Sequence, residues 1–209
     1  MPKIVDPHER RQAVAEAVFR VIERDGLDRA SLRTVAAEAG LAIGSVRHYF
    51  ASHAELMEFA MRAMVERVSA RLVTHADRLL AAATPLTWAE QREAVVAMLA
   101  EVLPLDEERR RECVVWLAFV TAARTRPELR ASADQPYDDM VELTTRVLRG
   151  AERAGALRDD VDIDLEARRL CAVLDGLSLH GVLHPTRLDP DTTLAVLRRH
   201  LAGLAREQS

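Results

Sequence analysis

One short stretch of the chain, residues 31–56, concentrates side chains that could bind DNA. They are arginines, histidines and a tyrosine set among small residues: Arg33, Arg47, His48, Tyr49 and His53. Arginine pairs with guanine edges and with phosphate, and histidine and tyrosine donate hydrogen bonds to phosphate. Two short helical patterns meet at Gly40 in this stretch, which is typical of a helix-turn-helix. We therefore expect the second pattern, residues 42–49, to act as a recognition helix in the major groove.

Smaller residues complete the predicted DNA-binding set. Gly44 and Ser45 would let the backbone approach the DNA, and Ser31 caps a helix whose N-terminus can hold a phosphate. The candidate DNA-binding residues are Ser31, Arg33, Thr34, Ile43, Gly44, Ser45, Arg47, His48, Tyr49 and His53. On spacing alone, a helical hairpin with solvated arginines is the alternative.

The elements that must position these residues are helices. Apolar residues recur at helical spacing along the whole chain, and seven of the 8 prolines fall at the ends of the periodic segments or between them. We expect about nine helices, at residues 7–25, 32–39, 42–49, 53–83, 88–104, 106–124, 127–154, 164–183 and from 191 onward. The sequence predicts an all-α fold: an N-terminal three-helix helix-turn-helix DNA-binding domain at residues 1–52 and a larger helical effector-binding and dimerisation domain at residues 53–209.

Charge and composition limit the function classes. The net charge of −4 means that bulk electrostatics do not predict DNA binding, so a local surface must provide it. The start of the chain lacks a secretory signal, and the longest apolar run is too short for a membrane span, so we expect a cytoplasmic protein without membrane contact. Cys113 and Cys171 lie in apolar helical patterns and are expected to be buried free thiols.

The first quarter of the chain resembles the DNA-binding domain of the TetR family of transcriptional regulators. The matching residues are Gly26, Ser31-Leu32, Val35-Ala36, Ala39-Gly40-Leu41, Gly44, Phe50 and Glu55-Leu56. The family usually has Ser or Thr where this chain has Ala42, and Tyr-x-His-Phe where it has Arg47-His48-Tyr49-Phe50; His53 stands where Lys is common. The missing cap at Ala42 is expected to cost about 1 kcal/mol of local helix stability.

Weaker likeness extends into the remainder, which is similar to the BetI-like branch of the family. Its motifs are Trp116-Leu117-Ala118-Phe119, Pro127-Glu128-Leu129 and Leu174-Asp175-Gly176-Leu177. The resemblance implies that the last two helices form a homodimer, since two helix-turn-helix units would read a palindromic operator in double-stranded DNA. The candidate interface residues are Val173, Gly176, Leu179, Leu183, Leu194, Leu197, Leu201 and Leu204. An ordinary core helix pair is the alternative.

A small-molecule effector would bind among the middle helices. Apolar walls with a few polar groups are usual for such pockets. The candidate lining residues are Trp88, Met98, Trp116, Phe119, Val120, Tyr137, Met140, Val141, Leu177, Asp175 and His180. Taken singly, each of them is better explained as a plain core residue.

Enzyme and metal functions have little support in the sequence. No phosphate loop, G-x-G-x-x-G or H-E-x-x-H is present, so we expect no catalytic residues and no cofactor. His180 and His184 form an i, i+4 pair, and the alternative function is therefore an all-helical metal- or small-molecule-binding protein. The favoured interpretation is a ligand-responsive repressor that a small-molecule effector releases from its operator.

Overall fold

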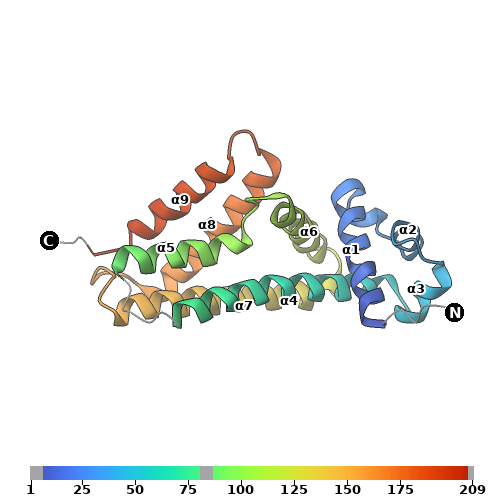
Figure 1. Cartoon of the computed structure of the whole chain (residues 1–209), viewed down its shortest axis with the longest axis horizontal. Helices are drawn as coiled ribbons and strands as arrows, with labels where there is room; N and C mark the ends of the chain where they lie inside the picture. The colour runs from blue at the N-terminus through green and yellow to red at the C-terminus, as the bar shows by residue number, and fades with distance from the viewer. Residues whose placement is uncertain (1–6, 81–86, 207–209) are drawn as a thin grey trace. The chain divides into compact units, whose positions relative to one another are not determined.

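The computed structural model describes residues 7–80 and 87–206, which are almost entirely helical (Figure 1). The elements are α1 (Pro7–Asp25), η1 (Leu27–Arg29), α2 (Leu32–Glu38), α3 (Ile43–Tyr49), α4 (His53–Leu80), α5 (Trp88–Leu99), η2 (Ala100–Val102), α6 (Glu107–Ala123), α7 (Pro127–Arg153), α8 (Ile163–Leu183) and α9 (Pro190–Ala202). Within the described residues, β pairing is confined to an isolated bridge between Leu157 and Ala205. The predicted all-α class is confirmed; the end predicted for the fourth helix near residue 83 lies outside the described residues.

The helices form two compact units, and each is described by itself. Unit 1 comprises residues 1–67 and 114–134, and unit 2 comprises residues 68–113 and 135–209. Three helices, α4, α6 and α7, contribute to both units. The functional boundary proposed between residues 52 and 53 therefore falls inside unit 1 and stays a prediction.

Unit 1 is built around one apolar core. Phe19, Phe50 and Phe119 are at most 1% exposed and belong to the same cluster, so residues of α6 complete the core beneath the first three helices. Two turns in this unit use glycine with positive φ, +83° at Gly26 and +66° at Gly40, a backbone conformation that favours glycine over residues with a Cβ. The second of these turns joins α2 to α3.

Unit 2 buries α5 against α8 and α9 (Figure 1). Thr87 is the N-cap of α5, and Glu90 completes a capping box with it. Leu197 and Leu201 of α9 lie in this core, and Leu204 lies in a smaller cluster with Leu148. None of the helices in the described part of the chain is long and apolar enough to cross a membrane.

Close packing inside unit 2 explains Gly181 of α8. A Cβ at this position would lie 2.6 Å from Cγ of Pro104, whereas a Cβ on Gly150 of α7 would meet nothing within 4 Å. We expect Gly181→Ala to lower the free energy of unfolding by about 1–3 kcal/mol, because the proline ring must move. Gly150→Ala, the matched control, should raise it by about 0.5–1 kcal/mol through helix propensity. Urea denaturation of both variants is the measurement, and equal effects would contradict the close contact.

Candidate nucleic-acid interface

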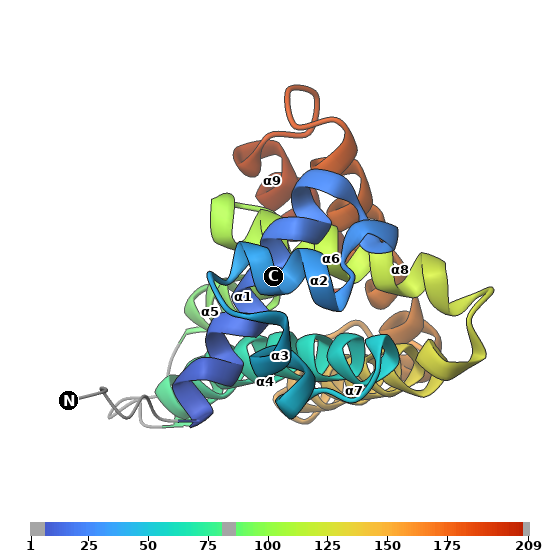
Figure 2. The ribbon, with the colours of Figure 1, turned by 90° about the vertical axis from the view of Figure 1, so that its right-hand side faces the viewer.

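The predicted recognition helix, α3, follows α2 (Figure 2) and has one buried and one exposed side. Val46 is fully buried and anchors the helix in the core of unit 1. The exposed side extends over two successive turns: Gly44, Arg47 and His48 point away from Val46, and Ile43 is exposed at the edge of this side. Ala42 begins the helix without a side-chain cap, as expected from the missing hydroxyl.

The remaining candidates divide into local structural roles and exposed surface. Ser31 accepts a hydrogen bond from the backbone N–H of Thr34 at 3.2 Å, and the Thr34 hydroxyl donates to the carbonyl of Arg29 at 2.5 Å. These two hydroxyls shape the start of α2. Arg33 is exposed beside them, while the other three candidates are half-buried: Ser45, Tyr49 and His53.

The charge of this surface is positive although the whole chain is acidic. Within the described residues, neither Arg33 nor Arg47 takes part in an ion pair, so both guanidinium groups are available to phosphate or base edges. The carboxylate of Glu38 is neutralised by Arg20 at 2.7 Å and Arg24 at 3.0 Å. Hydrogen bonds from Arg20 and then Arg24 hold the pKa of Glu38 below its usual value. The local acid therefore does not cancel the two free arginines.

Contacts that orient this surface were not predicted from the sequence. The Arg11 guanidinium of α1 lies 5.6 Å from the ring centroid of Phe50 and 5.3 Å from that of Phe59. Arg126, just after α6, pairs with Asp28 of η1. Arg20 and Arg24 are four residues apart, so the sequence places them on the same side of the helix. Nothing in the sequence identifies Glu38 as the partner that they share.

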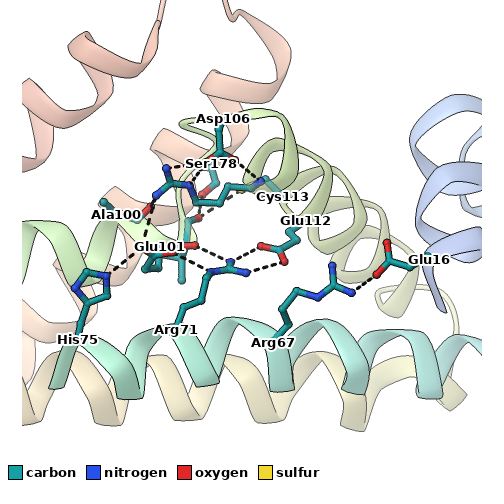
Figure 3. A network of polar contacts seen from close by, with 12 residues as sticks. Glu16, Arg67, Arg71, His75, Ala100, Glu101, Asp106, Glu112, Cys113 and Ser178 are labelled. Carbon is teal, nitrogen blue, oxygen red and sulfur yellow. Dashed lines mark hydrogen bonds and ion pairs between the residues drawn. The ribbon is translucent and has the colours of Figure 1, made fainter. Parts of the chain in front are cut away.

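A second polar constellation lies in unit 2, where α4, η2 and α6 meet (Figure 3). Arg71 forms two bonds with Glu112, Nη1–Oε1 at 3.1 Å and Nη2–Oε2 at 2.5 Å, and its Nε donates to Glu101 at 2.9 Å. Glu112 is only 5% exposed. The hydrogen bond to Glu112 raises the pKa of Arg71. His75 and Arg109 also reach Oε1 of Glu101, at 3.1 Å and 3.8 Å.

Figure 3 also shows Arg67, one turn before Arg71 on α4. Arg67 pairs with Glu16 of α1 within unit 1. Arg67 and Arg71, one turn apart, therefore pair within different units: Arg67 with Glu16 in unit 1, and Arg71 with Glu101 and Glu112 in unit 2.

The effector candidates divide between the two units. Phe119 is buried in the core of unit 1, and Trp116 and Val120 pack against that core. In unit 2, Met98 and Leu177 are buried, Met140 and Val141 are half-buried, and the exposed candidates are Tyr137, Asp175 and His180; Trp88 is the first residue of α5. Partial desolvation raises the pKa of Asp175. Phe119 and Leu177 already serve as core residues, and the effector role of the whole set stays a prediction.

The interface candidates are also unequal. The leucines Leu197, Leu201 and Leu204 are at most 8% exposed within the subunit. They are used for packing inside the subunit and leave almost no exposed area for a contact with a second subunit. Val173 and Leu194 pack against the same core and are half-buried. Leu179 and Leu183 are 39% and 59% exposed, and Gly176 faces open space. The exposed side of α8 also includes Leu165, at 62%, which the sequence reasoning missed.

His180, on α8, and His184, the C-cap of that helix, belong to no larger group of metal-binding side chains in the described part of the chain. The rings of His180 and His184 stack with centroids 5.9 Å apart. Across residues 7–80 and 87–206, no group of three or more His, Cys, Asp or Glu side chains could hold a metal ion. The thiols of Cys113 and Cys171 are free and buried. Burial raises the pKa of the Cys113 thiol to about 12, which disfavours the thiolate that binds metals.

Comparison with known proteins agrees with this geometry. Residues 15–59 match the model of bacterial regulatory proteins of the tetR family, and residues 91–206 match that of the BetI-type transcriptional repressor C-terminal domain. The HTH-type transcriptional regulator PksA of Bacillus subtilis (strain 168) is 35% identical over 209 residues, which cover 100% of this chain and 96% of that protein. BetI of Vibrio campbellii (strain ATCC BAA-1116) is 24% identical over 201 residues, covering 96% and 94% of the two chains.

Solved structures give the same result. A transcriptional regulator from Rhodococcus sp. Rha1 has a TM-score of 0.78 at 28% identity and covers 95% of this chain and 99% of its own. A regulator from Saccharomonospora viridis in complex with choline has a TM-score of 0.77 at 24% identity, with coverage of 96% and 100%; at that identity the likeness concerns the fold.

The helix-turn-helix and the family matches define a DNA-binding transcriptional regulator. The chain belongs to the TetR family of transcriptional regulators, with a C-terminal domain of the BetI type. This family comprises regulators rather than enzymes, and its members bind DNA operators and small-molecule effectors and act as dimers. The alternative of a metal- or small-molecule-binding protein without DNA function is not supported by these comparisons.

Proposed function

We propose that the chain is a homodimeric repressor that binds a palindromic operator through α3 and is released from it by a small-molecule effector. The observation that carries the proposal is the exposed side of α3, where Arg47 and His48 lie about one helical turn beyond Gly44 and make no ion pair with any residue that the structure describes. The half-buried Tyr49 and His53 would contact phosphates at its edge. As a regulator of bacterial genes it would act in the cytoplasm, where the DNA lies.

Dimerisation is supported by the apolar surface of α8. Leu165, Gly176, Leu179 and Leu183 follow helical spacing along one side, and the three leucines are exposed within the subunit. A line of exposed leucines beside an open glycine is unfavourable in water and suits a self-complementary two-fold contact. Two copies of the chain would then present two recognition helices.

The interface is tested by Leu179→Glu. A carboxylate brought into an apolar contact from both subunits should raise the dimer dissociation constant at least about 100-fold, because each charge would be buried without a partner. Val73→Glu is the matched control, since Val73 of α4 is 56% exposed and lies away from α8 in the sequence. Sedimentation velocity of both variants checks the outcome. A Leu179→Glu protein that stays dimeric would exclude this side of α8 from the interface.

Effector control is supported by the arrangement of charged residues on α4. Arg71 holds η2 and α6 through Glu101 and Glu112, while Arg67 holds α1 through Glu16. An effector that binds one conformation of α6 more tightly would make that conformation more populated. Because α4 is paired with α6, the position of α4 would change as well, and with it the affinity for the operator. The choline in the Saccharomonospora viridis regulator makes small organic cations a first class of effectors to screen.

The proposed function is tested with the DNA upstream of the protein's own gene. A gel shift should show sequence-selective binding. The affinity for this DNA should fall by about 10³-fold or more between 50 and 200 mM salt, as expected when several phosphates are neutralised. A scrambled duplex of equal composition is the control. Equal retention of both duplexes would reject the proposed operator binding.

A further inference from the structure

Ile43 is an exception to the burial of apolar side chains in unit 1. At 38% exposure it is the one large hydrophobic residue that is exposed in the described part of this unit. The other exposed large hydrophobics of the described chain belong to unit 2: Val73, Tyr137, Leu165, Leu179, Leu183 and Val196. The exception stands at the first position of α3, the helix proposed to read DNA.

Packing within unit 1 leaves more than a third of Ile43 exposed. Val46 is the buried anchor of α3, and Ile43, three residues before it, lies beside it at the edge of the exposed side, one turn before Arg47. Its neighbours Ala42 and Gly44 are exposed as well, so the start of the helix is a small apolar tip. A β-branched side chain is also not favoured by helix propensity. The residue therefore gains from a partner outside the subunit.

The chemistry of the major groove limits what that partner can be. Guanine, adenine and cytosine present hydrogen-bond donors and acceptors there, whereas thymine adds an apolar C5-methyl group. A solvent-exposed isoleucine has no hydrogen bond to offer, so the methyl group is the feature that matches it. Recognition helices contact base edges with their N-terminal residues, which is where Ile43 stands.

We propose that Ile43 selects thymine by contact with its C5-methyl group, in the same half-site that Arg47 reads; the proposal rests on the proposed operator binding. The four-residue separation of Ile43 and Arg47 corresponds to about 6 Å along a helix. Base pairs rise by about 3.4 Å. The thymine lies about two base pairs from the guanine or phosphate that Arg47 binds.

The experiment starts from duplexes selected by the wild-type protein from a random DNA library. Each thymine of the enriched sequence is replaced singly by deoxyuridine, which removes only the C5-methyl group. One thymine per half-site should lose affinity about fourfold on this replacement, and about fifteenfold when both half-sites are changed, as expected for one buried methyl group per contact. Ile43→Ala should bind the thymine and uracil duplexes equally. Val73→Ala, which shortens an exposed apolar side chain of unit 2, should keep the wild-type discrimination.

The outcomes separate this proposal from the function on which it rests. Failure to enrich any sequence would overturn operator binding and the thymine contact together. An enriched sequence with Arg47-dependent binding would uphold operator binding. If its uracil and thymine forms were then bound equally by the wild-type protein, or if Ile43→Ala kept the discrimination, the assignment of Ile43 would be overturned alone.

Discussion

Replacing Arg47 by alanine is expected to abolish specific operator binding while leaving the dimer intact. Arg47 is exposed on α3 and makes no ion pair with any residue that the structure describes, so its removal leaves no buried group unsatisfied. A base contact made by arginine contributes about 1–3 kcal/mol of discrimination. With two half-sites the loss should reach about 2–6 kcal/mol, which corresponds to about 30-fold to 10⁴-fold in affinity.

The measurement is a titration of Arg47→Ala on the operator and on a scrambled duplex, with Arg92→Ala as control. Arg92 is an exposed arginine of α5 in unit 2, so the control makes the same change in net charge outside the DNA-binding head. A uniform loss on both duplexes, with a salt slope smaller by about 1 per subunit, would assign Arg47 to phosphate rather than to a base. Unchanged operator affinity would exclude α3 as the recognition helix.

Arg71→Ala is expected to cause the largest loss of stability among single changes in unit 2. It removes both hydrogen bonds that Arg71 gives Glu112, whose carboxylate is almost fully buried. Loss of one partner from a buried ion pair costs about 3–5 kcal/mol, because the remaining charge has neither water nor a counter-ion. Urea denaturation followed by circular dichroism measures the difference.

Two further variants show whether the buried charge is the cause. Arg71→Met combined with Glu112→Leu removes both charges and should recover most of the lost stability. Arg146→Ala breaks the exposed pair of Arg146 with Glu142, at 3.8 Å, and should cost less than about 0.5 kcal/mol. A double variant as unstable as Arg71→Ala would show that the geometry of the cluster, rather than the unpaired carboxylate, carries the stability.

The helices and their ends could largely be predicted from the sequence because their causes are local. Ser31 and Thr87 act as N-caps through hydrogen bonds to residues three positions later. Gly26 and Gly40 take positive φ at the ends of the first two helices, as the sequence pattern indicates. Such signals lie within one turn of the residue that they affect.

Interactions between distant segments could not be predicted in this way. The leucine spacing of α9 is the same whether the seam faces its own subunit or a partner, and burial of Leu197 shows that it faces the subunit. Likewise, Phe119 was expected to line a pocket, but it completes the core beneath the DNA-binding helices. Periodicity identifies an apolar face and leaves its partner undetermined.

The candidate DNA surface lies between these cases. The exposed positions of α3 follow from helical spacing once Val46 is known to be buried. The charge balance does not, because the pairing of Glu38 with Arg20 and Arg24 joins residues 18 and 14 positions apart. Without that pairing the acid at the end of α2 would weaken a phosphate-binding surface.

Hydroxyl-radical footprinting of the wild-type protein on its selected operator tests the central claim most directly. Two recognition helices of a symmetric dimer should protect two half-sites that face the same side of the DNA, about one helical turn or a multiple of it apart. Protection in both half-sites should disappear with Arg47→Ala. A single protected block, or protection that persists without Arg47, would contradict a dimer that reads a palindrome through α3.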